Sequence, residues 1–336
     1  MTYRVAVWGT GNVGRFALRA AIHHPALEVA AVWVHSASKV GVDAARLAGL
    51  DGDVGVAATH DADAIVDATD IDCIIYATLS PDIHFPGTAV FLQTKLGIDG
   101  EEGCACYDIR QQCSGFVYGL EMADAFIRTD KYEKILLVGA ELHSHSLDYT
   151  TRGRDVSVLF GDGAGAVIVG RDETDNEQDG VLYTRCHADG SGAWNLYLKV
   201  FDISKRPYVW YDATKREESE MMYPQMKGKR VFLQAVRNMV MATQEALKKT
   251  GLTWDDIDWF VPHQANLRIN EAVVQYAEIP PEKALNTIMW YGNTTAATVP
   301  LTIDHWRREG KVKKGDLILS TVFGSGFTWG ATVFRL

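Results

Sequence analysis

Three residue types that can share one reaction, a cysteine, a histidine and an asparagine, occur far apart in this chain. Cys113 stands at the expected start of a helix that runs to about Arg128. There the positive end of the helix dipole lowers a thiol pKa and favours the nucleophilic thiolate. His263 follows an expected strand at 257–261, and Asn293 lies in a turn that contains glycine. A Cys–His–Asn set serves either hydrolysis or decarboxylative condensation, and the residue types alone leave both open.

A glycine pattern near the N-terminus offers a second kind of site. Gly9, Gly11 and Gly14 form G-x-G-x-x-G between an expected strand at 3–8 and a helix. In that context the backbone N–H groups bind a pyrophosphate. The next strand ends near Ser36 and carries no acidic residue, and a hydroxyl suits the 2′-phosphate of NADP better than the ribose of NAD. The alternative is a tight turn that binds no ligand.

Apolar runs and helical periodicity predict the elements that must position these residues. Strands and helices alternate, which is typical of an α/β fold. The stretch 171–224 is irregular and rich in charged residues, Tyr and Trp, and is expected to form loops and surface elements. The expected strands are 3–8, 29–34, 55–58, 73–77, 135–138, 159–169, 257–261, 317–322 and 327–334, and the main expected helices are 61–68, 88–96, 113–128 and 231–249.

Composition excludes several classes of protein. The 336 residues suffice for about two domains. The net charge of -10 argues against nucleic acid or an anionic membrane as the main partner. No apolar run approaches the ~18 residues of a membrane span, and the N-terminus reads as a strand, not a signal peptide. Five irregularly spaced cysteines indicate reduced cytoplasmic thiols, and their spacing predicts no metal site.

Five motifs occur in the order and with the spacing of one enzyme family. From about residue 70 to 336, the chain resembles β-ketoacyl-acyl-carrier-protein synthase III of the thiolase superfamily. The resemblance implies a five-layer αβαβα thiolase-like fold and a homodimer. The halves would be 70–170, with the cysteine, and 171–336, with a loop region, the histidine and the asparagine. The motifs are Tyr107–Phe116, Phe160–Ala166, Val261–Ile269, Tyr291–Thr294 and Phe323–Gly330.

The same resemblance implies a role for each site residue. Cys113 would attack an acyl-CoA thioester, and the backbone N–H groups of Cys113 and Ser325 would form the oxyanion hole. His263 and Asn293 would stabilise the enolate that malonyl-acyl-carrier protein leaves on losing carbon dioxide. The enolate would then attack the acyl-cysteine to give a 3-oxoacyl product, as in the initiation of fatty acid or polyketide synthesis. This chemistry requires no cofactor.

Further positions match binding residues of the family. Phe85 would enter the acyl pocket of the partner subunit, and Arg152 would lie near the CoA adenine. Arg268, together with Lys248 and Lys249, would offer a basic patch to an acidic carrier protein. An ordinary solvated helix face explains the two lysines equally well.

Residues 1–69 do not fit this family. They resemble the Rossmann N-terminus of dihydrodipicolinate-reductase-like dehydrogenases, and they lack the Trp and Arg with which the family holds the CoA nucleotide. We therefore interpret the chain as a chimera joined near residue 70, with a βαβ dinucleotide-binding-like segment before the join. We expect the Cys–His–Asn core to be retained and acyl-CoA priming to be weakened. The alternatives are an NADP-dependent reductase and a catalytically silent chimera.

Overall fold

The computed structural model describes residues 3–8, 12–25, 27–34, 36–59, 71–100, 103–171, 179–199 and 222–336. Two compact units make up the chain. The first comprises Met1–Asp72 and Val90–Cys104, and the second comprises Cys73–Ala89 and Ala105–Leu336. The helix predicted at 61–68 lies outside the described residues.

The first unit begins with the predicted βαβ arrangement. Strand β1 (Tyr3–Trp8) and strand β2 (Leu27–Trp33) pair in parallel, and helix α1 (Asn12–His23) connects them. A short 3₁₀ helix η1 (Ala37–Lys39) and helix α2 (Ala44–Ala48) follow.

The strand predicted at 55–58 is wrong. Only an isolated bridge between Asp43 and Ala57 forms there. The Asp43 carboxylate accepts hydrogen bonds from the N–H groups of Val54 and Gly55, and these bonds fold the segment into a loop.

The first sheet of the second unit has the strand order β4-β3-β5-β6. Strand β3 pairs in parallel with β4 and β5, whereas β6 runs antiparallel to β5. The C-terminal ends of β3, β4 and β5 therefore meet at one edge. The predicted bounds of β3 and of helix α4 are confirmed. The elements are β3 (Cys73–Ala77), β4 (Ala105–Ile109), 3₁₀ helix η2 (Gln112–Ser114), α5 (Gly115–Arg128), β5 (Lys134–Glu141), α6 (Arg154–Ser157) and β6 (Gly163–Gly170). Helix α4 (Thr88–Leu96) begins in the second unit and from Val90 onward belongs to the first.

The second sheet has the order β10-β11-β12-β7. Its strand β7 (Val181–Ala188) lies within the stretch 171–224, for which loops and surface elements were predicted but no strand was specified. β7 gains its order from antiparallel pairing with β12, and the interrupted apolar pattern of this segment does not reveal that pairing. The other elements are η3 (Gly190–Asn195), β8 (Leu196–Tyr197), β9 (Gln225–Met226), α8 (Gly228–Thr250), β10 (Trp259–Pro262), α9 (Leu267–Tyr276), η4 (Pro281–Lys283), α10 (Ile288–Tyr291), η5 (Thr295–Ala297), α11 (Thr298–Arg308), β11 (Leu317–Gly324) and β12 (Thr328–Arg335).

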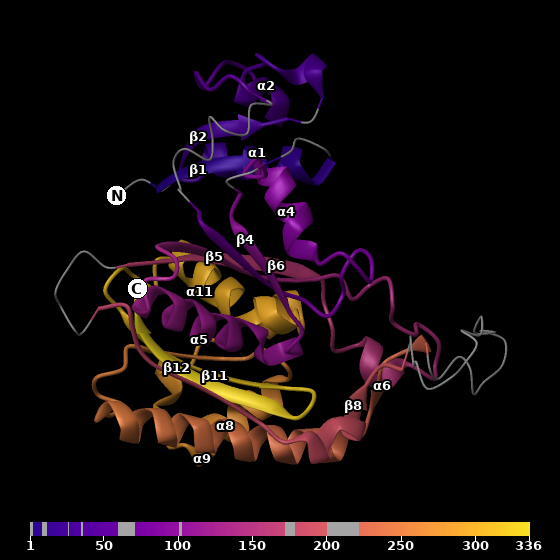
Figure 1. Cartoon of the computed structure of the whole chain (residues 1–336), viewed down its shortest axis with the longest axis vertical. Coiled ribbons are helices and arrows are strands. Elements are labelled where there is room, and N and C mark those ends of the chain that lie inside the picture. The colour runs from indigo at the N-terminus through magenta and orange to yellow at the C-terminus, as the bar shows by residue number, and fades with distance from the viewer. Residues whose placement is uncertain are drawn as a thin grey trace. The chain divides into compact units, whose positions relative to one another are not determined.

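Helices α5 and α11 lie between the two sheets of the second unit (Figure 1). One buried cluster joins Phe116 of α5 and Ile303 of α11 to Leu137 of the first sheet and Ile318 of the second. Helices α8 and α9 cover the other face of the second sheet (Figure 1). This layering is the α/β arrangement expected for a thiolase-like fold.

Among the described residues, no helix combines the length and the apolar character that crossing a bilayer requires.

Candidate active site

Cys113 lies in η2, at the N-terminal end of α5, as the sequence predicted. The residue before it, Gln112, has a positive φ of 45°, which is uncommon for a residue other than glycine. Gly324, at the end of β11, packs directly on this turn. A Cβ at Gly324 would lie 3.2 Å from the backbone nitrogens of Cys113 and Ser114. The nucleophile turn is therefore fixed by the second sheet as well as by its own helix.

The thiol of Cys113 is buried, with 6% of the residue exposed. Burial raises its pKa to about 12, and the nearby Glu141 carboxyl adds to the increase. The expectation that this thiol has a lowered pKa is therefore wrong, because burial, the largest effect on it, raises the pKa. The Asn293 side chain opposes the increase by hydrogen bonding to the thiolate form.

His263 follows β10 and is 1% exposed. Burial lowers the pKa of its imidazole to about 3, so the ring is neutral at physiological pH. Its Nδ1 lies 2.7 Å from the Thr298 hydroxyl, whereas Nε2 has no hydrogen-bond partner among the described residues. The Thr298 hydroxyl donates to the Thr295 carbonyl oxygen at 2.9 Å, and it must turn from that oxygen to Nδ1 to donate to the imidazole. Neutral His263 carries its proton on Nε2 when Thr298 donates to Nδ1.

The carboxamide of Asn293 has a defined orientation. Its Oδ1 accepts a hydrogen bond of 2.9 Å from the backbone N–H of Thr295, which leaves Nδ2 as the donor that faces Cys113. Thr295 donates this bond from a backbone conformation with a positive φ of 47°, which is strained for a threonine. The strained Thr295 therefore orients the Asn293 amide.

Two glycines allow the Asn293 loop to pack closely. Gly292 has a φ of 64°, which disfavours other residues. A Cβ at Gly161 would lie 2.1 Å from the Tyr291 carbonyl oxygen. The Gly161 N–H donates to the Asn293 carbonyl, and the Asn293 N–H donates to Leu159. The glycine-rich segment before β6 thus supports the asparagine and is not a phosphate loop.

The structure brings Cys113, Asn293 and His263 together through η5. Asn293 interacts with Cys113, Thr295 joins Asn293 to Thr298, and Thr298 contacts His263. Such a site offers a thiol nucleophile beside two neutral nitrogen donors, an arrangement suited to stabilising a developing oxyanion.

Ser325 lies in the connection between β11 and β12, next to Gly324. Its hydroxyl donates to the Leu196 carbonyl, which turns the side chain away from Cys113 and leaves the backbone as the part suited to the predicted role. A bond of 2.6 Å between the hydroxyls of Ser114 and Thr328 ties this connection to the nucleophile turn.

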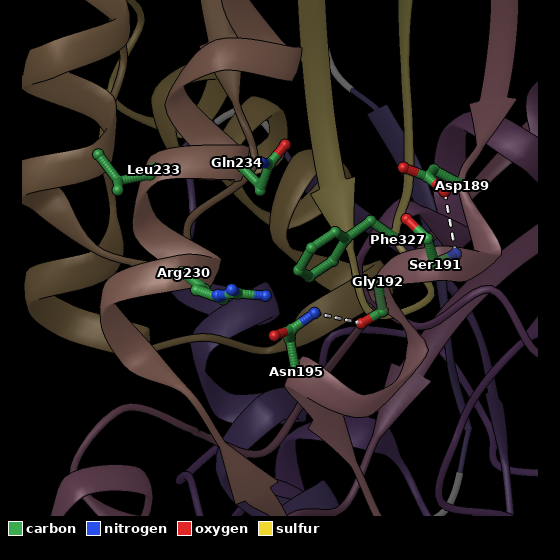
Figure 2. Close-up of a pocket in the computed structure, with 8 residues that line it drawn as sticks. All are labelled: Asp189, Ser191, Gly192, Asn195, Arg230, Leu233, Gln234 and Phe327. Carbon is green, nitrogen blue, oxygen red and sulfur yellow. Dashed lines mark hydrogen bonds between the residues drawn. The ribbon is translucent and has the colours of Figure 1, made fainter.

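A cavity of about 400 Å³ adjoins the same connection. Figure 2 shows Arg230 of α8 extending toward Asn195 and the ring of Phe327. The cavity was not predicted from the sequence, because η3 and the first turns of α8 form it only in the folded chain.

Phe85 and Arg152 occupy different environments. Phe85 is 80% exposed on the segment between β3 and α4, so within one chain it fills no pocket. Arg152 donates from Nε to Asp148 Oδ2 at 2.5 Å, and its guanidinium lies 5.5 Å from the centre of the Tyr223 ring.

The three basic residues do not form one cluster. Lys248 and Lys249 lie in the last turn of α8, which ends at Gly251. Trp254, just beyond, donates to the carbonyl of Ala277, so the C-terminal ends of α8 and α9 lie together. Arg268 is in the first turn of α9, roughly 14 Å along the helix from that end. The structure therefore separates it from the two lysines.

The N-terminal glycine pattern is only partly described. Gly9 and Gly11 lie outside the described residues, whereas Gly14 is part of α1. Ser36 is exposed at the start of η1, and its hydroxyl pairs with that of Ser38. A dinucleotide site here stays a prediction.

Sequence reasoning missed Thr295, Thr298 and Glu141. The first two follow Asn293 in the run TTAAT, whose small residues signalled a tightly packed turn. Glu141 ends β5, beyond the strand predicted at 135–138, and a lone acidic residue in that place carries no signal of its own.

Comparisons with known proteins support the predicted resemblance. The family model for 3-oxoacyl-[acyl-carrier-protein] synthase III matches residues 107–190, and the model for its C-terminal part matches 247–336. The β-ketoacyl-[acyl-carrier-protein] synthase III of Xanthomonas campestris pv. campestris is 42% identical over 270 residues, 80% of this chain and 78% of that protein. The Alkalilimnicola ehrlichii protein of the same name is 40% identical, covering 80% of this chain and 79% of its own length.

Solved structures agree with this result. The 3-oxoacyl-[acyl-carrier-protein] synthase III of Aquifex aeolicus matches with a TM-score of 0.69 and 37% identity, covering 87% of this chain and 81% of that one. The priming β-ketosynthase of the R1128 polyketide pathway also has a TM-score of 0.69, with 29% identity, covering 87% and 78%. These matches extend beyond the roughly four-fifths of the chain that residues 70–336 represent, and the predicted chimera is not borne out.

Proposed function

This chain belongs to the 3-oxoacyl-[acyl-carrier-protein] synthase III family, and we propose that it performs the decarboxylative condensation of an acyl thioester with malonyl-acyl-carrier protein through Cys113, His263 and Asn293. The observation that carries these residue roles is the contact chain from Cys113 through Asn293, Thr295 and Thr298 to His263. This chain of contacts links the thiol to the Asn293 carboxamide and to the neutral His263 imidazole.

In the first half-reaction, the Cys113 sulfur attacks the carbonyl carbon of an acyl-CoA. The carbonyl oxygen becomes an oxyanion, which the backbone N–H groups of Cys113 and Ser325 stabilise. Collapse of this intermediate breaks the bond to the CoA sulfur, and CoA leaves with the proton that Cys113 loses. The acyl group remains on Cys113. An apolar surrounding suits this neutral thioester better than it suits the thiolate.

In the second half-reaction, malonyl-acyl-carrier protein loses carbon dioxide, and the electron pair of the broken bond forms an enolate. Asn293 Nδ2 and His263 Nε2 donate hydrogen bonds to the enolate oxygen. This requires that Thr298 donates to His263 Nδ1, so that the imidazole proton resides on Nε2. The enolate carbon attacks the acyl-cysteine, and the Cys113 thiolate leaves as the 3-oxoacyl product forms on the carrier.

Neither half-reaction transfers electrons to a cofactor, so the proposed activity needs none. NADP at Gly9, Gly11, Gly14 and Ser36 stays a separate prediction, which titration with NADPH tests. The described residues include all five cysteines and hold no disulfide between them, as a reducing compartment requires, and we place the enzyme in the cytoplasm.

The proposed assembly is a homodimer in which Phe85 of each subunit enters the acyl pocket of the other. The exposure of this aromatic side chain supports the proposal, since a large apolar group in water gains by burial at an interface. Replacement of Phe85 by alanine should widen the range of acyl chains accepted. An unchanged chain-length preference would argue against this contact.

The test of the proposed function is intact-protein mass spectrometry after incubation with a panel of acyl-CoAs. We expect a mass increase of one acyl group that is absent from the Cys113→Ala variant. Addition of malonyl-acyl-carrier protein should then remove the acyl group and release carbon dioxide. Failure to form any adduct, with a folded protein, would contradict the proposal.

A further inference from the structure

Glu141 is a buried acid that neither half-reaction uses. It ends β5 and is 5% exposed. Its carboxyl accepts hydrogen bonds from the Leu79 N–H at 3.1 Å and from the Ser80 hydroxyl at 2.8 Å. Among the described residues, no Lys, Arg or His forms an ion pair with it. A buried carboxyl without a cation is costly to ionise.

This carboxyl lies against the turn that carries the site. Gly139, two residues earlier on the same face of β5, packs so closely on η5 that a Cβ there would lie 2.6 Å from the Ala296 carbonyl oxygen. Glu141 also meets Thr295, whose hydroxyl interacts favourably with the ionised carboxylate and so opposes the effect of burial.

Electrostatics agrees with the geometry. Burial raises the pKa of Glu141 to about 7, and the negative charge of its ionised form raises the pKa of Cys113. Among the described residues, Tyr76 of β3 also interacts with Glu141, and its own pKa is raised by burial and by nearby carboxylates. The residues that face it from η5 and β6, Thr295 and Gly163, do not titrate.

We propose that Glu141 is a positioning residue: its buried carboxyl supports the Thr295 turn that orients Asn293, and its ionisation disfavours the Cys113 thiolate. This inference rests on the proposed nucleophile. The pKa of the Cys113 thiol is then lower, and its thiolate fraction at a given pH is larger, when the Glu141 carboxyl is uncharged. Above neutral pH the two negative charges oppose each other across the buried site.

The test is the rate at which iodoacetamide alkylates Cys113 between pH 5.5 and 9.5, read from the Cys113 peptide by mass spectrometry. The wild-type rate should rise with pH and show a shoulder near pH 7, where Glu141 ionises. In Glu141→Gln the shoulder should vanish, and the rate above pH 8 should exceed the wild-type rate several-fold to about tenfold. Asp256→Asn is the matched control and should keep the wild-type profile. The Asp256 carboxylate also accepts a backbone N–H and a hydroxyl, but on the surface.

Two results would overturn the proposal: a wild-type profile without a shoulder, or a Glu141→Gln profile parallel to that of the wild type at every pH. Glu141→Asp keeps an ionisable group and should retain a shoulder, which provides a second test should the glutamine variant fail to fold. Alkylation needs no acyl donor. A shoulder without acyl transfer would therefore refute the proposed function and leave this inference standing.

Discussion

Replacement of Thr298 by valine tests how His263 is held in the form that donates from Nε2. The hydroxyl of Thr298 lies 2.7 Å from Nδ1 and 2.9 Å from the Thr295 carbonyl oxygen. Valine has nearly the same shape but can neither donate nor accept a hydrogen bond. The change removes the partner of Nδ1 and leaves the ring free to place its proton on either nitrogen.

The size of the effect follows from burial. His263 is 1% exposed, so water does not replace the lost hydroxyl. A buried polar group left without a partner costs about 1–3 kcal/mol. Since each 1.36 kcal/mol is a factor of ten in rate, condensation should slow by about tenfold to 100-fold.

The assay separates the two half-reactions. In Thr298→Val, release of carbon dioxide from malonyl-acyl-carrier protein should fall, whereas acylation of Cys113 by acyl-CoA should stay within about twofold of the wild type. Thr298→Ser restores the hydroxyl and should recover most of the rate. Wild-type decarboxylation by the valine variant would refute the reasoning, and so would an equal loss in both half-reactions, which indicates general damage to the fold.

Three further predictions concern the same site. Gly161→Ala puts a Cβ against the Tyr291 carbonyl oxygen, so the Asn293 loop must shift. The rate of condensation should fall more than tenfold and the Tm should be lower. An unchanged kcat would contradict this packing. Burial lowers the pKa of His263 to about 3, so the ring stays neutral between pH 7 and pH 5. The rate of carbon dioxide release should therefore show no loss over this range. A loss centred near pH 6.5 would mean that the ring titrates as an exposed histidine. Arg268→Glu should raise KM for malonyl-acyl-carrier protein several-fold at low salt, whereas Lys248→Glu, at the far end of the helix pair, should not. Equal effects of the two variants would support the predicted patch of three basic residues.

Elements with strong local patterns could be predicted from the sequence. The run at 73–77 and the helix at 88–96 have the predicted bounds, because an uninterrupted apolar run sets the first and the flanking Gly87 and Gly97 delimit the second. Strand β7 could not be predicted, because its order comes from pairing with β12, which lies more than 140 residues later. The strand predicted at 55–58 does not form, because the Asp43 carboxylate accepts hydrogen bonds from the backbone N–H groups of Val54 and Gly55.

The same distinction applies to the site. The residue types of Cys113, His263 and Asn293, together with the family motifs, were enough to select them. Thr298 and Glu141 could not be found, because their effects depend on distances that only the folded chain sets. The acidity of Cys113 was mispredicted for a related reason: the sequence shows the start of the helix but not the depth at which the thiol is buried.

The bond between Ser114 and Thr328, which closes the turn around the nucleophile, joins residues 214 positions apart. Contacts of such long range form late in folding, because the entropy of closing the intervening chain must be overcome before they add stability. Refolding should therefore restore secondary structure well before it restores catalysis. A chain still growing on the ribosome has Cys113 long before β12, and its nucleophile turn lacks this support until synthesis is almost complete.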